Sequence, residues 1–183
     1  ATTEIYTLSL HDALLISSFV FINCAGPCPR VTEAVKILHD HYRDKPLKFV
    51  TFTVDPKRDT VEALKGYADA YGADPDRWYF LTGERDELYS LIKGSFLMPV
   101  GEAPKPVPGY EIIHTTNICL VDSTGRVVGK YNSTNGPEIA ELRRDLRRML
   151  QFPVPGFSNS KTESGIGSDQ GASDEQETAG TSE

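Results

Sequence analysis

Apolar side chains along this chain follow two spacings, one typical of buried strands and one typical of helices. A run at 17–23 with an apolar centre and an alternating run at 47–54 predict two strands of a buried sheet. Between them, apolar positions recur at helical spacing, which predicts a helix from Pro29 to about Arg43. Proline suits the first turn of a helix because its missing N–H has no helical partner there.

The pattern continues to residue 150. Asp59, with Glu62 three positions later, indicates a helix start and a helix to about Tyr71. Further helices are predicted from about Gly83 and over 137–150, and further strands at 78–81, 117–121 and 126–131. A proline-rich loop spans 98–109, and a turn at 122–125 joins the last two strands into a hairpin. The order β-α-β-α-β-α-β-β-α predicts an α/β domain with a thioredoxin-like fold, a central mixed sheet flanked by helices.

The two ends of the chain do not fit this pattern. Residues 1–16 lack the basic start and the small-residue cleavage site of a signal peptide. We predict that they are a leader, mostly non-native between Glu4 and Leu14, which replaces the N-terminal hairpin usual in such folds. The alternative is a genuine leader that is disordered or weakly helical. Residues 17–150 are then the domain, and 151–183, rich in Ser, Gly, Thr and acids, are predicted to be a disordered acidic tail.

Composition and charge narrow the class of protein. Of the 183 residues, 39% are hydrophobic and 25% charged, as in ordinary globular proteins. The formal net charge of −7 is concentrated in the tail, which carries −5, so the rest carries only −2. Residues 1–150 are nearly neutral overall, so their net charge gives no indication of the basic surface that nucleic-acid binding requires. No apolar run approaches the roughly 20 residues of a membrane span.

Cys24 and Cys28 are the residues most suited to chemistry. Three cysteines are too few for a disulfide framework, so a close pair indicates reactivity. The pair lies between a predicted strand and a predicted helix, where the helix N-terminus favours the reactive and ligating thiolate. Three intervening residues allow either a disulfide or two ligands on one metal ion. The structural alternative is that the two are unrelated buried cysteines without a chemical role.

His114 is the third candidate. It lies between the proline-rich loop and the strand at 117–121, so we expect it at the end of the sheet where the thiols lie. Two thiolates and one imidazole suit copper, whereas zinc would require a fourth ligand that is not evident. From spacing alone, a lone histidine is more often structural, and both interpretations stay open.

Other candidates receive ordinary structural interpretations. Cys119 is predicted to be a buried strand residue, Met98 to pack in its loop, and His39 and His41 to be solvated. Asp55 and Asp59 are expected to cap a turn and a helix, with a role near a metal or partner surface as the alternative. The last helix presents a basic face that we expect to be solvated, the alternative being docking of an acidic partner: Arg143, Arg144, Arg147 and Arg148.

Four segments, in order, resemble the motifs of the Sco/SenC family. Residues 21–29 match its Cys-x-x-x-Cys-Pro motif, and residues 53–60 match Val-Asp-Pro-x-x-Asp-Thr. Residues 81–83 match Leu-Thr-Gly, and residues 113–122 match His-x-Thr followed by Leu-Val-Asp. The resemblance covers about residues 18–150.

The resemblance implies a function. Members of the family bind copper through the two cysteines and the histidine, here Cys24, Cys28 and His114. They supply copper to the binuclear copper centre of cytochrome c oxidase, or keep the thiols of that centre reduced. By resemblance, the partners are a copper-receiving oxidase subunit and a thiol reductant protein. A membrane anchor and a periplasmic or intermembrane-space location are also implied.

Two other functions remain open. In a thiol–disulfide oxidoreductase, Cys24 would attack and Cys28 would resolve the mixed disulfide, without need of His114. A peroxiredoxin-like peroxidase is less favoured, because Phe21 occupies the position where that family has a threonine. We therefore interpret the chain as a copper-binding metallochaperone rather than an enzyme, with a disulfide as its off state.

Overall fold

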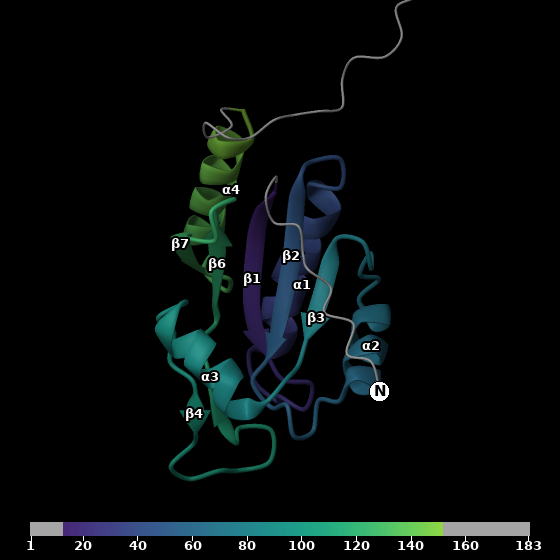
Figure 1. Ribbon diagram of the computed structural model, residues 1–183, viewed down its shortest axis with the longest axis vertical. Helices are drawn as coiled ribbons and strands as arrows, with labels where there is room; N and C mark the ends of the chain where they lie inside the picture. The colour runs from purple at the N-terminus through teal and green to yellow at the C-terminus, as the bar shows by residue number, and fades with distance from the viewer. Residues whose placement is uncertain (1–12, 152–183) are drawn as a thin grey trace, which may run out of the picture.

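The computed structural model describes residues 13–151, which form a mixed five-stranded sheet flanked by helices, with a separate two-stranded ladder (Figure 1). The elements follow the predicted order, with one short strand added in the proline-rich loop and another just before His114. Their bounds are β1 Leu14–Val20, α1 Cys28–His41, β2 Leu47–Thr53, α2 Val61–Ala70, β3 Trp78–Leu81, α3 Arg85–Gly94, β4 Gly101–Glu102, β5 Ile112–Ile113, β6 Asn117–Val121, β7 Val127–Asn132 and α4 Gly136–Gln151.

The sheet has the order β3-β2-β1-β6-β7. β1, β2 and β3 run parallel, whereas β6 is antiparallel to β1 and forms a hairpin with β7. Helix α1 packs on β1, α2 lies beside β3 and α4 beside β7. This arrangement confirms the α/β prediction of a mixed central sheet flanked by helices.

The central strand β1 holds the core together. All seven of its residues are buried, and Phe19 packs its ring against Phe52 of β2 and Phe96 after α3. A strand with neighbours on both sides and layers on both faces has no solvent face, which explains why its sequence is apolar apart from two small serines, of which Ser18 is hydrogen-bonded to Thr51. At the end of β1, where the chain turns toward the cysteines, Val20 pairs with Thr53 of β2.

The predicted position of β1 is wrong by three residues. The strand runs from Leu14 to Val20 rather than over 17–23, and Ile16 pairs with Phe49 of β2 and Leu120 of β6. A continuous apolar run does not reveal its own ends, because only strand pairing sets them. The predicted leader boundary at residue 16 therefore falls inside the central strand. The rest of that leader, residues 1–12, and the tail after Gln151 lie outside the described residues.

Two polar side chains also lie elsewhere than predicted. His39 was expected in solvent, but it is 5% exposed and packs against the rings of Phe49 and Trp78. Asp59 does not cap α2, because Thr60 does so by accepting a hydrogen bond from the Ala63 N–H. In both cases the tertiary structure, which local spacing does not encode, sets the position. No helix between residues 13 and 151 has the length and apolar character needed to cross a membrane.

Candidate metal centre

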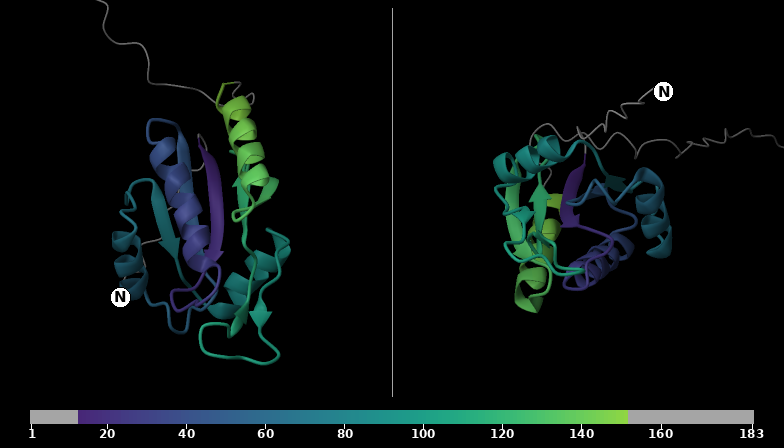
Figure 2. Two further views of the ribbon diagram at one scale, coloured as in Figure 1. Left: turned by 180° about the vertical axis from the view of Figure 1, so that it is seen from behind. Right: turned by 90° about the horizontal axis from the view of Figure 1, so that it is seen from below.

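Sheet topology brings Cys24, Cys28 and His114 to one end of the molecule. The turn after β1 carries Cys24, and Cys28 begins α1. Because β6 is antiparallel to β1, the start of β6 lies beside the end of β1, and His114 is three residues before that start. The ends of the parallel strands, β4 and the loop before β5 lie together at the lower end of the molecule in Figure 1, and Figure 2 shows the same grouping from behind.

The three side chains converge on a small volume. His114 Nε2 lies 3.2 Å from Cys28 Sγ and 3.9 Å from Cys24 Sγ. The three ligand atoms all lie within 4.8 Å of one another, and all three cysteines of the chain are free thiols. The structure thus brings together the three residues that the sequence singled out, in a group able to hold a metal ion.

The hydrogen bonds of His114 fix the ring nitrogen that faces the sulfurs. Its Nδ1 lies 3.0 Å from the carbonyl oxygen of Thr115, and because a carbonyl only accepts, Nδ1 must carry the proton. Nε2 then keeps its lone pair and points at the thiols. Burial lowers the pKa of His114, so the ring stays neutral in the form that binds metal ions. The ring of Phe21 packs edge-on against it, with ring centroids 5.5 Å apart.

The two cysteines differ in environment. Cys28 is 1% exposed, and burial raises the pKa of its thiol far above the usual value. We expected the N-terminus of α1 to favour the thiolate at this position, but the cost of desolvation is larger here. Cys24 is 8% exposed and receives the Gly26 N–H at 3.4 Å, while Cys28 Sγ receives the Phe21 N–H at 3.5 Å. Each sulfur thus accepts one backbone N–H, which would stabilise a negative charge on it.

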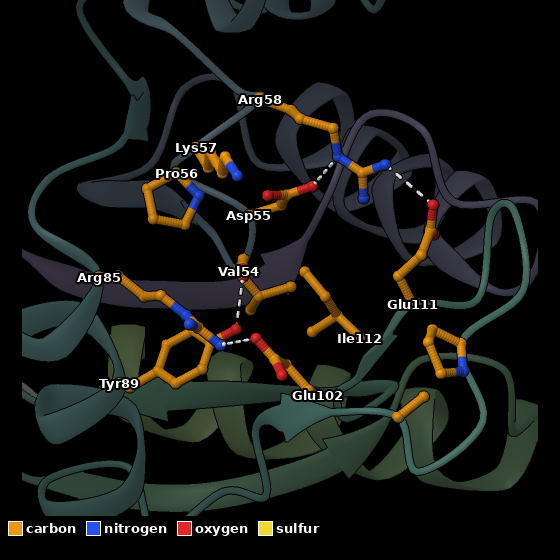
Figure 3. A pocket seen from close by; sticks show the side chains of 12 residues that line it. Val54, Asp55, Pro56, Lys57, Arg58, Arg85, Tyr89, Glu102, Glu111 and Ile112 are labelled. Carbon is orange, nitrogen blue, oxygen red and sulfur yellow. Dashed lines mark hydrogen bonds and ion pairs between the residues drawn. The ribbon is translucent and has the colours of Figure 1, made fainter.

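A cavity of about 420 Å³ lies between the turn at 54–58, the start of α3 and the loop 102–112 that leads to His114 (Figure 3). Across it, Arg58 pairs with Asp55 and, at 2.9 Å, with Glu111, while Arg85 reaches Glu102 at 2.8 Å. These ion pairs tie the loop that leads to His114 to the body of the domain. The carbonyl of Asp55 accepts the Arg58 and Asp59 N–H groups in the predicted turn, and its side chain bonds to Arg58.

Asp59 is hydrogen-bonded to the turn after β1. Its Oδ2 accepts hydrogen bonds from the Thr53 hydroxyl at 2.6 Å and from the Ile22 N–H at 3.2 Å. The side chain is 1% exposed, and burial raises the pKa of the carboxyl group. Asp59 thus connects the end of β2 to the turn that carries Cys24, a role that sequence spacing did not reveal.

The remaining candidates are Cys119, Met98 and His41. Cys119 is fully buried in β6, as predicted, and burial raises the pKa of its thiol to about 12. Met98 is buried, and His41 is exposed. Sequence reasoning missed Gly109 and Tyr110, which contact the cysteine turn. The available signal was a tyrosine four positions before His114, directly after a glycine in a proline-rich loop.

The donor set favours a soft metal ion. Thiolate sulfur is a soft ligand and imidazole suits copper, so two sulfurs and one Nε2 match copper better than calcium or magnesium. Zinc is usually held by four ligands, and within residues 13–151 the group contains three candidate side chains. The residues present therefore fit copper.

Comparison with known proteins identifies the family. The SCO1/SenC family model matches residues 7–151, which is most of the chain. The chain belongs to the SCO1/SenC family. The match includes all three residues of the metal centre and every described element of the fold.

Solved structures of Sco proteins have the same fold. A SCO1/SenC family lipoprotein from Bacillus anthracis aligns with a TM-score of 0.69 at 27% identity, over 78% of this chain and 84% of that one. BsSco, described as having a disulfide switch and as a member of the Sco family of cytochrome c oxidase assembly proteins, aligns at 0.64 and 27% identity, over 76% and 81%. ScoI of Bradyrhizobium japonicum, solved with copper bound, aligns at 0.55 and 28%, over 78% and 88%.

Proposed function

We propose that this protein is a copper metallochaperone that holds copper through Cys24 Sγ, Cys28 Sγ and His114 Nε2. The observation that carries the proposal is the convergence of the three donor atoms within 4.8 Å, with the Nε2 lone pair of His114 turned toward both sulfurs. The copper-bound structure of the Bradyrhizobium japonicum relative supports it. Copper is the cargo of the protein and not a catalyst.

The acceptor that we propose is the copper-receiving subunit of a terminal oxidase, for assembly of its binuclear copper centre. The description of BsSco as a member of a family of cytochrome c oxidase assembly proteins supports this proposal. Such a role places the domain outside the cytoplasm, on the periplasmic face of a membrane or in the mitochondrial intermembrane space, where oxidases receive copper.

Redox control of loading is the second part of the proposal. Oxidation of Cys24 and Cys28 joins the two sulfurs in a disulfide and releases two electrons and two protons to an oxidant, such as a protein or small-molecule disulfide that becomes two thiols. The disulfide has no thiolate to offer a metal, so this form is unable to load. A thiol reductant protein restores the binding form by the reverse exchange.

One feature favours a rival function, thiol–disulfide exchange. Cys28 is almost fully buried and Cys24 somewhat less so, which is the usual difference between a resolving and an attacking thiol. The two functions differ in their need for His114. An exchange enzyme keeps most of its reductase activity when that imidazole is removed, whereas a chaperone loses copper affinity.

Anaerobic titration of the reduced protein with Cu(I) tests the proposal. We expect one copper per chain for the wild type and a loss of affinity of about a hundredfold or more for Cys24→Ser, Cys28→Ser and His114→Ala, because each removes one of three ligands. His41→Ala is the matched control, since it removes an exposed histidine from α1. Absence of copper uptake by the reduced wild type, or an unchanged affinity in His114→Ala, would contradict the proposal.

A further inference from the structure

The turn that carries the cysteines is held by the segment that leads to His114. The Ala25 N–H donates to the Gly109 carbonyl at 3.0 Å, and the Tyr110 hydroxyl donates to the Ala25 carbonyl at 3.2 Å. Both backbone polar groups of Ala25 are thus bonded to two consecutive residues of the loop. Ala25 directly follows Cys24, and Tyr110 lies four positions before His114, so these bonds join the two halves of the metal centre.

The two segments approach as closely as glycine allows. Gly109 has a φ of +82°, and a Cβ atom there would lie 2.5 Å from Ala25 Cβ and 2.9 Å from Ala25 N. A Cβ atom on Gly26 would lie 2.9 Å from Cε1 of the Tyr110 ring. Real Cβ atoms do not approach other heavy atoms to 2.5 Å, so any side chain at Gly109 would push the loop off the turn. We call the contacts of Gly109 and Tyr110 with residues 25–26 the turn clamp.

We propose that Gly109 and Tyr110 are positioning residues of the metal centre, which through the turn clamp assemble the three donor atoms before copper arrives. The inference rests on the proposed function and extends it to two residues that do not touch the metal. Cys28 and His114 are 86 positions apart in the chain. Without the clamp, each binding event would have to order the turn against the loop, at a cost in conformational entropy that lowers affinity.

Tyr110 is half exposed, which indicates that its hydroxyl contributes little to the global stability of the fold. The side chain is 52% exposed and outside the core, unlike Tyr89, whose hydroxyl is bonded to the Val54 carbonyl inside the domain. A half-exposed hydroxyl finds water when its partner is lost, so its removal costs little global stability. Its hydrogen bond to the backbone of the cysteine turn then has a local effect, on the position of Cys24.

The test is Tyr110→Phe in the full chain, with Tyr79→Phe as the matched control. Tyr79 also donates its hydroxyl to a backbone carbonyl, that of Asp76, at the amino end of β3 and away from the cysteine turn. We expect Tyr110→Phe to lower the affinity for Cu(I), measured in competition with a coloured Cu(I) chelator, by about three- to tenfold, the effect of one ordinary hydrogen bond. Tyr79→Phe should leave this affinity unchanged, and neither variant should shift the thermal midpoint appreciably.

A second readout needs no metal. Cys24 is 8% exposed in the clamped turn, so its alkylation by iodoacetamide requires the turn to open. In the reduced, copper-free protein we expect alkylation of Cys24 to be about three- to tenfold faster in Tyr110→Phe than in the wild type or Tyr79→Phe, since the same bond opposes opening. Fragment-ion mass spectrometry of the peptide that holds both thiols, which are not separated by a Lys or Arg, distinguishes the alkylation of Cys24 from that of Cys28.

Gly109→Ala, with and without Ala25→Gly, provides a steric test of the clamp. We expect Gly109→Ala to increase the Cys24 alkylation rate at least as much as Tyr110→Phe. Adding Ala25→Gly removes the closest clash, between the two Cβ atoms, and should restore part of the protection. No recovery in the double variant, when Gly109→Ala has an effect, would contradict the assigned contact.

The outcomes separate this inference from the proposed function. Equal copper affinity and equal alkylation rates in Tyr110→Phe and the wild type would overturn the turn clamp, as would a lower thermal midpoint with both rates and affinities unchanged. If the wild type takes up no copper, the proposed function fails. The alkylation rates then still decide whether Tyr110 positions the cysteine turn.

Discussion

At the scale of single residues, the protonation states of the ligands set how copper binding depends on pH. Burial raises the pKa of Cys28, so this thiol is protonated at neutral pH and must release its proton when copper binds. Burial lowers the pKa of His114, so its Nε2 is already free above the ordinary histidine range. The affinity should therefore increase with pH through neutrality because of Cys28, and decrease more steeply only at a pH low enough to protonate His114.

The slope of this dependence is measurable. For each proton released, the apparent Cu(I) affinity increases about tenfold per pH unit. Between pH 6.5 and 8 we expect the apparent Cu(I) affinity to increase at least about tenfold per pH unit, measured by competition with a chelator of known pH dependence. An affinity independent of pH over this range would show that Cys28 binds copper without losing a proton, or does not bind it.

Asp59 connects β2 to the cysteine turn through a single oxygen atom, Oδ2. Both of its hydrogen bonds are accepted by Oδ2, so an asparagine with its amide oxygen in that place accepts both bonds without a buried charge. We expect Asp59→Ala to lower the free energy of unfolding at pH 7 by about 1–3 kcal/mol, because the Thr53 hydroxyl and the Ile22 N–H lose their partner. Asp59→Asn should cost much less or be neutral.

The contribution of Asp59 to stability depends on pH. Burial raises the pKa of its carboxyl group above the unfolded value, so the folded protein favours the protonated form. The contribution of this group to stability is therefore greatest at low pH and diminishes as pH rises through the folded pKa. Urea unfolding from pH 4 to 7 should show this trend for the wild type relative to Asp59→Asn. The opposite trend would mean that the buried carboxylate is stabilised as an anion.

At the scale of elements, the sequence predicted the kind of each element better than its limits. Each helix and strand of the main sheet was predicted, because long periodic segments report which face is buried. The limits of β1 were wrong, because residues 13–22 are nearly all apolar and only pairing with β2 and β6 selects the paired residues. Strands β4 and β5 were missed, because two residues each are too few for any periodicity.

Ile16 lies in the predicted leader but pairs in the central strand β1, so we expect it to contribute to stability. Ile16 is fully buried, so Ile16→Ala should lower the free energy of unfolding by about 2–5 kcal/mol. Ile37→Ala is the control, since that side chain is 48% exposed on α1 and should cost about 0.5 kcal/mol or less beyond helix propensity. Chemical denaturation compares the two. Equal small effects would place Ile16 outside the core.

At the scale of the whole molecule, the metal centre depends on contacts that sequence spacing alone does not reveal. The pairing of Cys24 with Cys28 is visible in the sequence because both lie between one strand and one helix. The approach of His114 is a property of topology, since it requires β6 to run antiparallel to β1. The place of His114 in the chain predicted that it lies at the end of the sheet near the thiols, but only the resemblance to the Sco/SenC family favoured a ligand over a structural histidine. Asp59 lies in one of the matched family motifs, whereas Gly109 and Tyr110 lie outside all of them and had no comparable signal.

We propose that two sulfurs and one imidazole nitrogen bind copper together. X-ray absorption at the copper edge of the reduced, singly loaded full chain tests it most directly, because this method counts the sulfur and imidazole neighbours of the metal. We predict two sulfur ligands and one imidazole in the wild type, and loss of the imidazole signal with both sulfurs kept in His114→Ala. A copper ion surrounded by nitrogen and oxygen alone, or an unchanged imidazole signal in His114→Ala, would contradict the account.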